Sequence, residues 1–135
     1  MKIVNILSWI LRITAAVILL QTLYFKFTAH PESVALFTKL GVEPWGRIGT
    51  GVLELITGIL LLLPAAAFTG GFLGMVLMIG AIASHLFVIG IASNGDGGQL
   101  FTLAIVVLLC CIVIQIIHRR DGMNLVRRLF PNTRS

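Results

Sequence analysis

The sequence predicts an all-α protein, a four-helix transmembrane bundle with a short amphipathic interfacial helix between the first and second spans. Of the 135 residues, 58% are hydrophobic and only 11% are charged, whereas about a quarter of the residues in a soluble globular domain are charged. The apolar residues gather in four stretches of about twenty residues, the length that crosses the hydrocarbon core of a bilayer. No stretch alternates between apolar and polar residues as a strand does. Because backbone groups in lipid must be hydrogen-bonded internally, these stretches are expected to be helices.

The chain is predicted to form one transmembrane domain, residues 1–118, followed by a basic cytoplasmic tail, residues 119–135. The first apolar stretch runs into aromatic residues without a small-residue cleavage site, so we interpret it as a retained span and not as a signal peptide. The four spans are predicted at about residues 6–25, 47–64, 70–92 and 99–118.

Half of the basic residues lie at the carboxyl end of the chain. Five of the ten follow Ile117, namely Arg119, Arg120, Arg127, Arg128 and Arg134. Beside a hydrophobic span, such a cluster indicates membrane topology and contact with anionic lipid, and it argues against nucleic-acid binding. The positive-inside rule makes the tail cytoplasmic, and four spans then place the amino terminus on the same side.

The longest polar connection, residues 28–46, contains the predicted interfacial helix. Pro31 followed by Glu32 is typical of a helix start, and apolar residues then recur at helical spacing until Gly41. We expect this helix to lie on the membrane surface as a lid over the bundle. A plain loop with a few interfacial side chains is the alternative, because the segment is short for an isolated helix.

A single carboxylate, Glu54, lies inside the second span. A charge at membrane depth is costly, by a few kcal/mol on insertion scales. Glu54 shares a helix face with Gly51, Thr57 and Gly58, and small and polar residues on one face are typical of a helix–helix contact. Glu54 is therefore expected to point into the bundle.

Polar side chains from several spans are predicted to meet at one depth, in the outer half of the bundle. Glu54 follows Arg47 by about seven residues and His85 precedes Ala92 by about seven, which is roughly 10 Å of helix in each case. Four further residues, the candidate ligand-binding residues, lie near this level: Gln21, Lys26, Asp96 and Gln99.

Glu54 and His85 form a candidate proton-handling pair and are the candidate catalytic residues. A neutral imidazole can accept a hydrogen bond from a quinol hydroxyl while the carboxylate takes or relays the proton. The alternative is structural, with Glu54 pairing with Lys26, Arg47 or His85 only to fix helix register. Ionisable residues inside a membrane favour the functional interpretation.

No metal site is expected from the sequence. One histidine and one glutamate inside the spans give fewer ligands than the three or four that zinc takes. Cys110 and Cys111 match neither a metal spacing nor a C-x-x-C motif, and we interpret them as small apolar packing residues.

Five short segments, by their order and spacing, carry a family resemblance. They are Phe25-Lys26-Phe27, residues 40–44 (LGVEP), residues 51–58 (GVLELITG), Ser84-His85-Leu86 and residues 95–101 (GDGGQLF). Together they resemble the DoxX-like family of small bacterial integral membrane proteins. The resemblance implies a four-helix inner-membrane protein in which Lys26, Glu54, His85 and Asp96 occupy the family's polar positions. The family takes its name from a subunit of an archaeal thiosulfate:quinone oxidoreductase, and some relatives are linked to oxidative-stress or thiol-redox membrane complexes.

Three functions stay open at this point. The first is a quinone-interacting or accessory subunit of a membrane redox complex; since the chain has no motif for a bound haem or flavin, the redox centre then belongs to the quinone or to a partner protein. The second is a small-molecule or lipid-binding or transport module. The third is a non-catalytic membrane assembly protein, held as a homo-oligomer or on a larger partner.

Overall fold

All of the regular structure in the computed structural model, which describes residues 2–131, is helical, with no strand in that range. Along the chain the helices are α1 (Lys2–Gln21), α2 (Leu23–Phe27), α3 (Pro31–Lys39), α4 (Trp45–Leu62), α5 (Ala67–Ser84), the π-helix η1 (His85–Ile89), α6 (Gln99–Ile117) and α7 (Arg119–Leu129). Four helical segments are long and apolar enough to cross a membrane, at Lys2–Phe27, Trp45–Leu62, Ala67–Ile89 and Gln99–Ile117. The predicted all-α, four-span class is confirmed, and the protein is a membrane protein.

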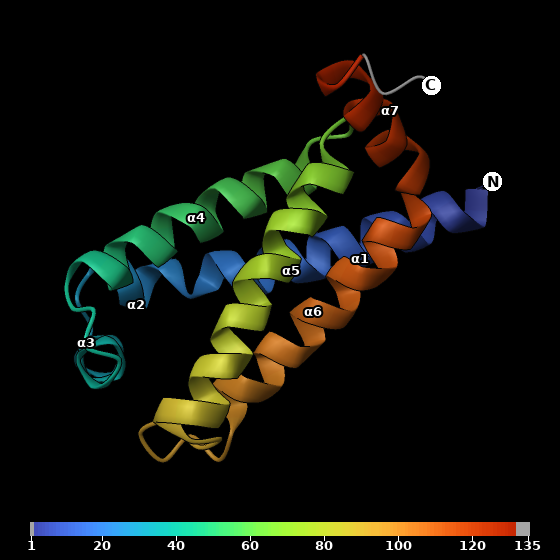
Figure 1. Ribbon diagram of the computed structural model, residues 1–135. Helices are drawn as coiled ribbons and strands as arrows, with labels where there is room; N and C mark the ends of the chain where they lie inside the picture. Colours follow the sequence, from blue (N-terminus) through green and yellow to red (C-terminus); the bar gives the residue numbers. More distant parts are fainter. Residues whose placement is uncertain (1, 132–135) are drawn as a thin grey trace.

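The four spans form a ring. Helices α1 and α5 each pack against both α4 and α6. Figure 1 shows that the pair α1–α4 and the pair α5–α6 diverge toward the end of the bundle that carries α3. The buried core includes Ala15 and Leu19 from α1, Leu61 from α4 and Val107 and Ile114 from α6. Because the pairs diverge, the helices leave space at the α3 end.

Glycines allow two of the helix pairs to approach closely. A Cβ atom on Gly70 would lie 2.8 Å from the backbone nitrogen of Leu61, and one on Gly58 would lie 2.7 Å from Cδ2 of Leu20. Small residues at such contacts are the usual means of helix association in lipid, where van der Waals packing replaces the hydrophobic effect. The glycines thus fix α5 on α4 and α4 on α1.

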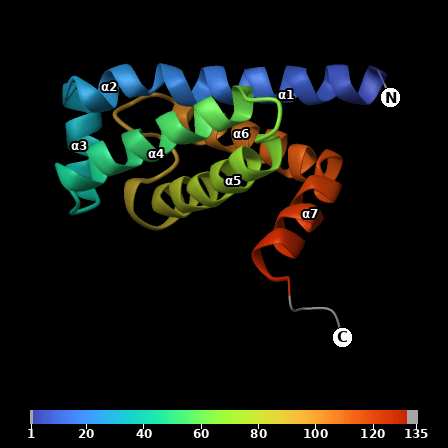
Figure 2. The same cartoon turned by 90° about the horizontal axis from the view of Figure 1, so that it is seen from above.

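The basic segment after the fourth span is helical. Helix α7 follows α6 after His118 alone and turns away from the bundle, running crosswise to α1 (Figure 2). Its residues are exposed except for Gly122, which packs against the ring of Phe68 in the first turn of α5. The contact holds the first turn of α7 against the bundle.

Arg12 caps the end of α4 from inside the bundle. Its side chain is buried, with 2% of the residue exposed. Its Nε donates to the carbonyl of Leu61 at 2.7 Å, its Nη2 donates to the carbonyl of Leu63 at 2.5 Å, and its Cζ lies 3.8 Å from the centre of the Trp9 ring. The last carbonyls of a helix lack partners within it, and a cation is favoured there. Arg12 supplies both the hydrogen-bond donors and the positive charge at this helix end.

We predict that Arg12→Met lowers the free energy of unfolding by about 3 kcal/mol, because the buried carbonyl of Leu61 and the partly buried carbonyl of Leu63 lose a charged donor. Unfolding in mixed detergent micelles, followed by circular dichroism, measures the change. Thr14→Val is the matched control, since the Thr14 hydroxyl bonds only the Ile10 carbonyl of its own helix. An Arg12→Met protein as stable as the wild type would show that the cap contributes nothing.

Candidate functional site

A cavity of about 540 Å³ lies at the α3 end of the bundle, between the diverging helix pairs. Most of its wall is apolar, with side chains such as Leu36, Phe37, Met78 and Leu103. Its volume is within the range of about 300–1,000 Å³ that is usual for small-molecule sites. All six residues selected from the sequence line it, namely Gln21, Lys26, Glu54, His85, Asp96 and Gln99. Residues predicted to lie at one depth therefore surround one space in the structure.

The carboxylate of Glu54 is the centre of the polar part of this wall. Glu54 is buried, with 5% of the residue exposed. Its Oε2 accepts hydrogen bonds from Lys26 Nζ at 2.9 Å and from Thr22 Oγ1 at 2.9 Å. Both bonds use the same oxygen, and within residues 2–131 no donor is found on Oε1. The charge is thus neutralised by a cation from α2 while one oxygen stays available on the cavity side.

Lys26 is held in place through its backbone. The buried guanidinium of Arg47, at the start of α4, donates from Nη1 to the Lys26 carbonyl. Its Nε is paired with the Glu43 carboxylate, at 2.8 Å and 3.1 Å from the two oxygens. Because a charge-assisted bond is stronger than a neutral one, this arrangement fixes the end of α2 on α4. It keeps the ammonium of Lys26 within reach of Glu54.

His85 faces the cavity from the opposite helix pair. It is buried, with 5% of the residue exposed, and its ring stands edge-on to Phe101 with the ring centres 5.8 Å apart. Its Nδ1 lies 3.0 Å from the carbonyl of Gly90. A carbonyl only accepts, so Nδ1 carries the hydrogen, and in the neutral ring Nε2 is then an acceptor. The structure thereby assigns the tautomer.

The position of His85 depends on a change of helix type. At His85 the α-helix becomes the π-helix η1, and the backbone nitrogen of Gly90 donates to the His85 carbonyl at 2.7 Å. Short π segments inside α-helices occur frequently at functional sites. The wider turn ends at Gly90, whose φ of 90° suits glycine, and it places the Gly90 carbonyl on the imidazole.

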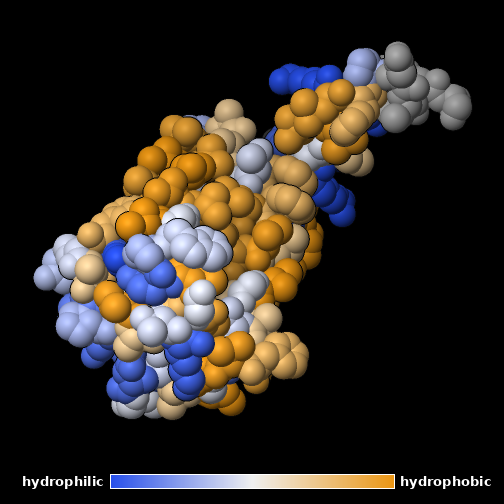
Figure 3. Space-filling view, turned by 60° about the vertical axis from the view of Figure 1, so that its left-hand side comes forward, coloured by the Kyte–Doolittle hydropathy of each residue, from blue (hydrophilic) through white to orange (hydrophobic). Residues whose placement is uncertain are grey.

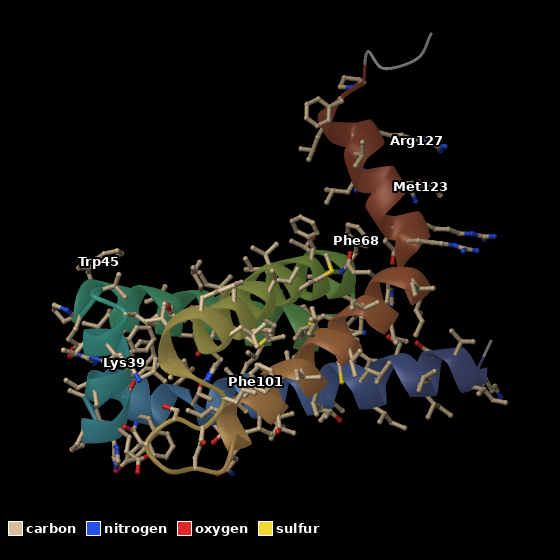
Figure 4. The ribbon with its side chains drawn as sticks, turned by 60° about the horizontal axis from the view of Figure 1, so that its bottom comes forward. Lys39, Trp45, Phe68, Phe101, Met123 and Arg127 are labelled. Atoms are coloured by element: carbon tan, nitrogen blue, oxygen red, sulfur yellow. The ribbon has the colours of Figure 1, made fainter. Side chains whose placement is uncertain are left out.

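Helix α3 joins the two diverging pairs across the cavity. It contacts α2 and α4 on one side and η1 on the other. At its last residue, Lys39 Nζ donates to the carbonyl of Ile89 at 3.1 Å, and near its start the Glu32 carbonyl accepts from Asn94 Nδ2 at 3.1 Å. Lys39 is visible beside the π-helix end in Figure 4. The predicted short helix is present, and its apolar side chains form part of the cavity wall.

Asp96 organises the loop between η1 and α6. Its Oδ1 accepts from the backbone nitrogens of Ser93 at 2.9 Å and Gly98 at 2.8 Å, and its Oδ2 accepts from that of Leu100 at 3.2 Å. Burial acts to raise the pKa of Asp96, but the backbone N–H groups around it outweigh burial, and the net pKa lies below the ordinary value. The carboxylate is therefore occupied by its own loop.

The sequence did not identify Thr22 as a partner of Glu54. Its neighbour Gln21, predicted as a ligand-binding residue, lines the cavity but is exposed. Helix α1 ends at Gln21 and α2 begins at Leu23, so Thr22 lies in the break between them. Within residues 2–131 no hydrogen bond joins Glu54 to His85. Glu54 bonds instead to Lys26 and Thr22, and His85 bonds to the Gly90 carbonyl.

A second chain of polar contacts lies at the opposite end of the bundle. Ser8 Oγ is 2.7 Å from His118 Nε2, and His118 Nδ1 is 3.1 Å from Asp121 Oδ2. The order resembles that of a serine hydrolase, but only 1% of Ser8 is exposed, so a substrate has no access to its hydroxyl. These bonds tie α1 to the junction of α6 and α7.

Among the described residues, no group of three or more histidine, cysteine or acidic side chains is placed to hold a metal ion. Cys110 and Cys111 are both buried and unpaired with one another as a disulfide. Cys111 lies against α5, where its Sγ would be 2.8 Å from a Cβ on Gly74. This contact fits a packing role.

Comparison with known proteins adds one finding. The family model described as the DoxX-like family matches residues 10–114 of the chain. No curated protein and no solved structure matches. The matched range contains the four spans nearly complete and the whole cavity wall.

We predict that Asp96→Asn destabilises the protein, because an amide cannot accept on both sides from the loop N–H groups. Since the pKa of Asp96 is lowered in the folded state, its stabilisation is fully present above the unfolded pKa of about 3.9 and is lost as the pH falls through the folded value. The difference in melting temperature between wild type and Asp96→Asn should be constant from about pH 7 to pH 5 and shrink below about pH 4. A difference that grows toward low pH would contradict this assignment.

Proposed function

The chain belongs to the DoxX-like family, and from this membership and the cavity at the α3 end we propose that the protein binds a quinone within the membrane, as a quinone-interacting or accessory subunit of a membrane redox complex. The observation that carries the proposal is the composition of the cavity wall. The Glu54–Lys26 pair lies on one side, and His85, with an acceptor nitrogen, lies on the other.

The polar groups suit both oxidation states of a quinone. An oxidised quinone presents two carbonyl oxygens, which need donors, and the ammonium of Lys26 is a strong one. A reduced quinol presents two hydroxyls, which need acceptors, and Glu54 Oε1 and His85 Nε2 are acceptors. The apolar wall around Leu36, Met78 and Leu103 suits the ring and the start of an isoprenoid tail.

Proton transfer follows from the same groups. Oxidation of a quinol to a quinone releases two electrons and two protons. In the proposed reaction the electrons pass to a partner redox protein, while His85 and Glu54 each take one proton from a hydroxyl. The reverse sequence reduces the quinone. Lys26 stabilises the negative charge that develops on a quinone oxygen during either direction.

The proposed setting is the bacterial inner membrane, with both termini cytoplasmic. The arginines of α7 support this orientation through the positive-inside rule, and the cavity then lies in the outer half of the bilayer. Electrons would be exchanged with a partner on that side. A homo-oligomer is compatible with the apolar outer surface of the bundle (Figure 3).

We predict that Glu54→Gln and His85→Ala each weaken the binding of decylubiquinol by about tenfold or more, since each removes a hydrogen bond of 1.5–3 kcal/mol or so to a charged or polar group. Titration of the purified protein in detergent measures the affinity. Thr14→Val, on the lipid-facing part of α1, is the control and should leave the affinity unchanged. Equal affinity in wild type and in both site variants would reject the proposal, and pH-dependent solute flux in proteoliposomes would favour transport instead.

A second prediction concerns the shape of the cavity. Ala81→Leu adds three carbons to a side chain on the cavity wall and should abolish quinone binding while the Lys26–Glu54 pair remains. The matched variant is Ala83→Leu, on the same helix but not on that wall. Melting temperatures of both variants show whether the bundle is intact. Full binding by an intact Ala81→Leu protein would place the quinone elsewhere.

A further inference from the structure

Beyond Arg119, its first residue, which lies at the angle of the apolar face, helix α7 separates apolar and polar side chains onto two faces. At 3.6 residues per turn, one face contains Gly122, Met123, Leu125, Val126 and Leu129. The opposite face contains Arg120, Asp121, Asn124, Arg127 and Arg128. All of these side chains except Gly122 are exposed. An amphipathic helix whose apolar face is not covered by its own protein requires another apolar surface.

The orientation of α7 matches the plane of a membrane. If α1 crosses the bilayer, a helix crosswise to α1 lies parallel to the bilayer surface, and Figures 1 and 2 show α7 in that direction. It begins two residues after α6 ends at Ile117, which places its first turn at the membrane interface. Its start is fixed by the Ser8–His118 bond at 2.7 Å.

The apolar face of α7 is turned toward the hydrocarbon. Gly122 lies on this face and packs on Phe68, the second residue of the third span. Figure 4 shows Phe68 at the foot of α7, with Arg127 projecting further along the helix. Because Phe68 belongs to a span, the side of α7 that meets it is the side that meets the bilayer. The arginine face is then directed to the headgroups and the water.

We propose that α7 is an interfacial helix that binds anionic phospholipid headgroups. Its apolar face inserts below the headgroups, and its arginines bind the negatively charged headgroups. Asp121 is the acidic residue on the polar face, and its carboxylate is paired with His118 at 3.1 Å. The remaining charge on that face is positive. This inference does not depend on quinone binding at the other end of the bundle.

The test places a fluorescent label on each face in the full chain. Met123→Cys marks the apolar face and Asn124→Cys marks the polar face, and each is labelled with an environment-sensitive dye. Labelled wild type is the background, because Cys110 and Cys111 are buried. The proteins are placed in nanodiscs of phosphatidylcholine alone or of phosphatidylcholine with phosphatidylglycerol, and quenching by aqueous iodide is measured.

We expect the label at position 123 to be protected from iodide by at least about fivefold in the discs with phosphatidylglycerol, and the label at 124 to stay accessible. Arg127→Gln with Arg128→Gln should weaken the membrane binding of α7 by about fivefold for each arginine and thereby remove this protection, and high salt should do the same. Lys2→Gln removes a charge near the amino terminus and should have no such effect. Unchanged melting temperatures confirm that the variants are folded.

Three results would overturn the proposal. Full quenching at position 123 in both kinds of disc would show that α7 does not reach the lipid. Protection that is independent of phosphatidylglycerol and of the arginines would show apolar insertion without headgroup recognition. Protection that persists in detergent and yields cross-links between two copies would show that a second chain covers the face.

Discussion

The buried charge of Glu54 is the constraint on which the α3 end of this protein depends. A carboxylate at that depth needs a cation, and the nearest one, Lys26, lies just where α1 has given way to the short helix α2. Lys26 reaches Glu54 because Arg47 binds its carbonyl, and Arg47 can be buried because Glu43 neutralises it. The two ion pairs thus fix the end of α2 on α4. Lys26 and Glu54, which form one of them, are part of the polar wall of the cavity.

The fold class could be predicted because apolar periodicity and span length act over many residues. Depth could also be predicted, since a helix rises by 1.5 Å per residue whatever its neighbours do, and this is why residues from four segments line one cavity. The rotation of each helix about its own axis was harder to predict from the sequence. Depth alone placed Gln21 near Glu54, but the hydroxyl that bonds the Glu54 carboxylate belongs to its neighbour Thr22, in the break between α1 and α2.

The π-helix at His85 illustrates a second limit. Its sequence, HLFVI, is mainly apolar like the α-helix before it, and nothing in it signals a wider turn. At its end the carbonyl of Ile89 accepts a hydrogen bond from Lys39, fifty residues earlier, and Gly90 takes a φ of 90° that ends the helix. The end of this span is therefore in contact with a residue far away in the sequence. The imidazole tautomer, and with it the acceptor at Nε2, follows from the Gly90 carbonyl that lies on Nδ1.

The site is also held from a distance by packing. Toward the α7 end, Gly70 packs directly on the backbone of α4 and Gly58 on the side chain of Leu20, and Arg12 closes the end of α4 by binding two carbonyls. Helices packed so tightly at one end move little relative to one another there, because a close-packed interior is not easily compressed. Their divergence is set at the tight end, whereas two hydrogen bonds, of Lys39 to Ile89 and of Asn94 to Glu32, and the packing of α3 on η1 join the pairs across the cavity. Glu54, on α4, is therefore positioned from the tight end of the bundle, whereas the π-helix that carries His85 also depends on its contacts with α3.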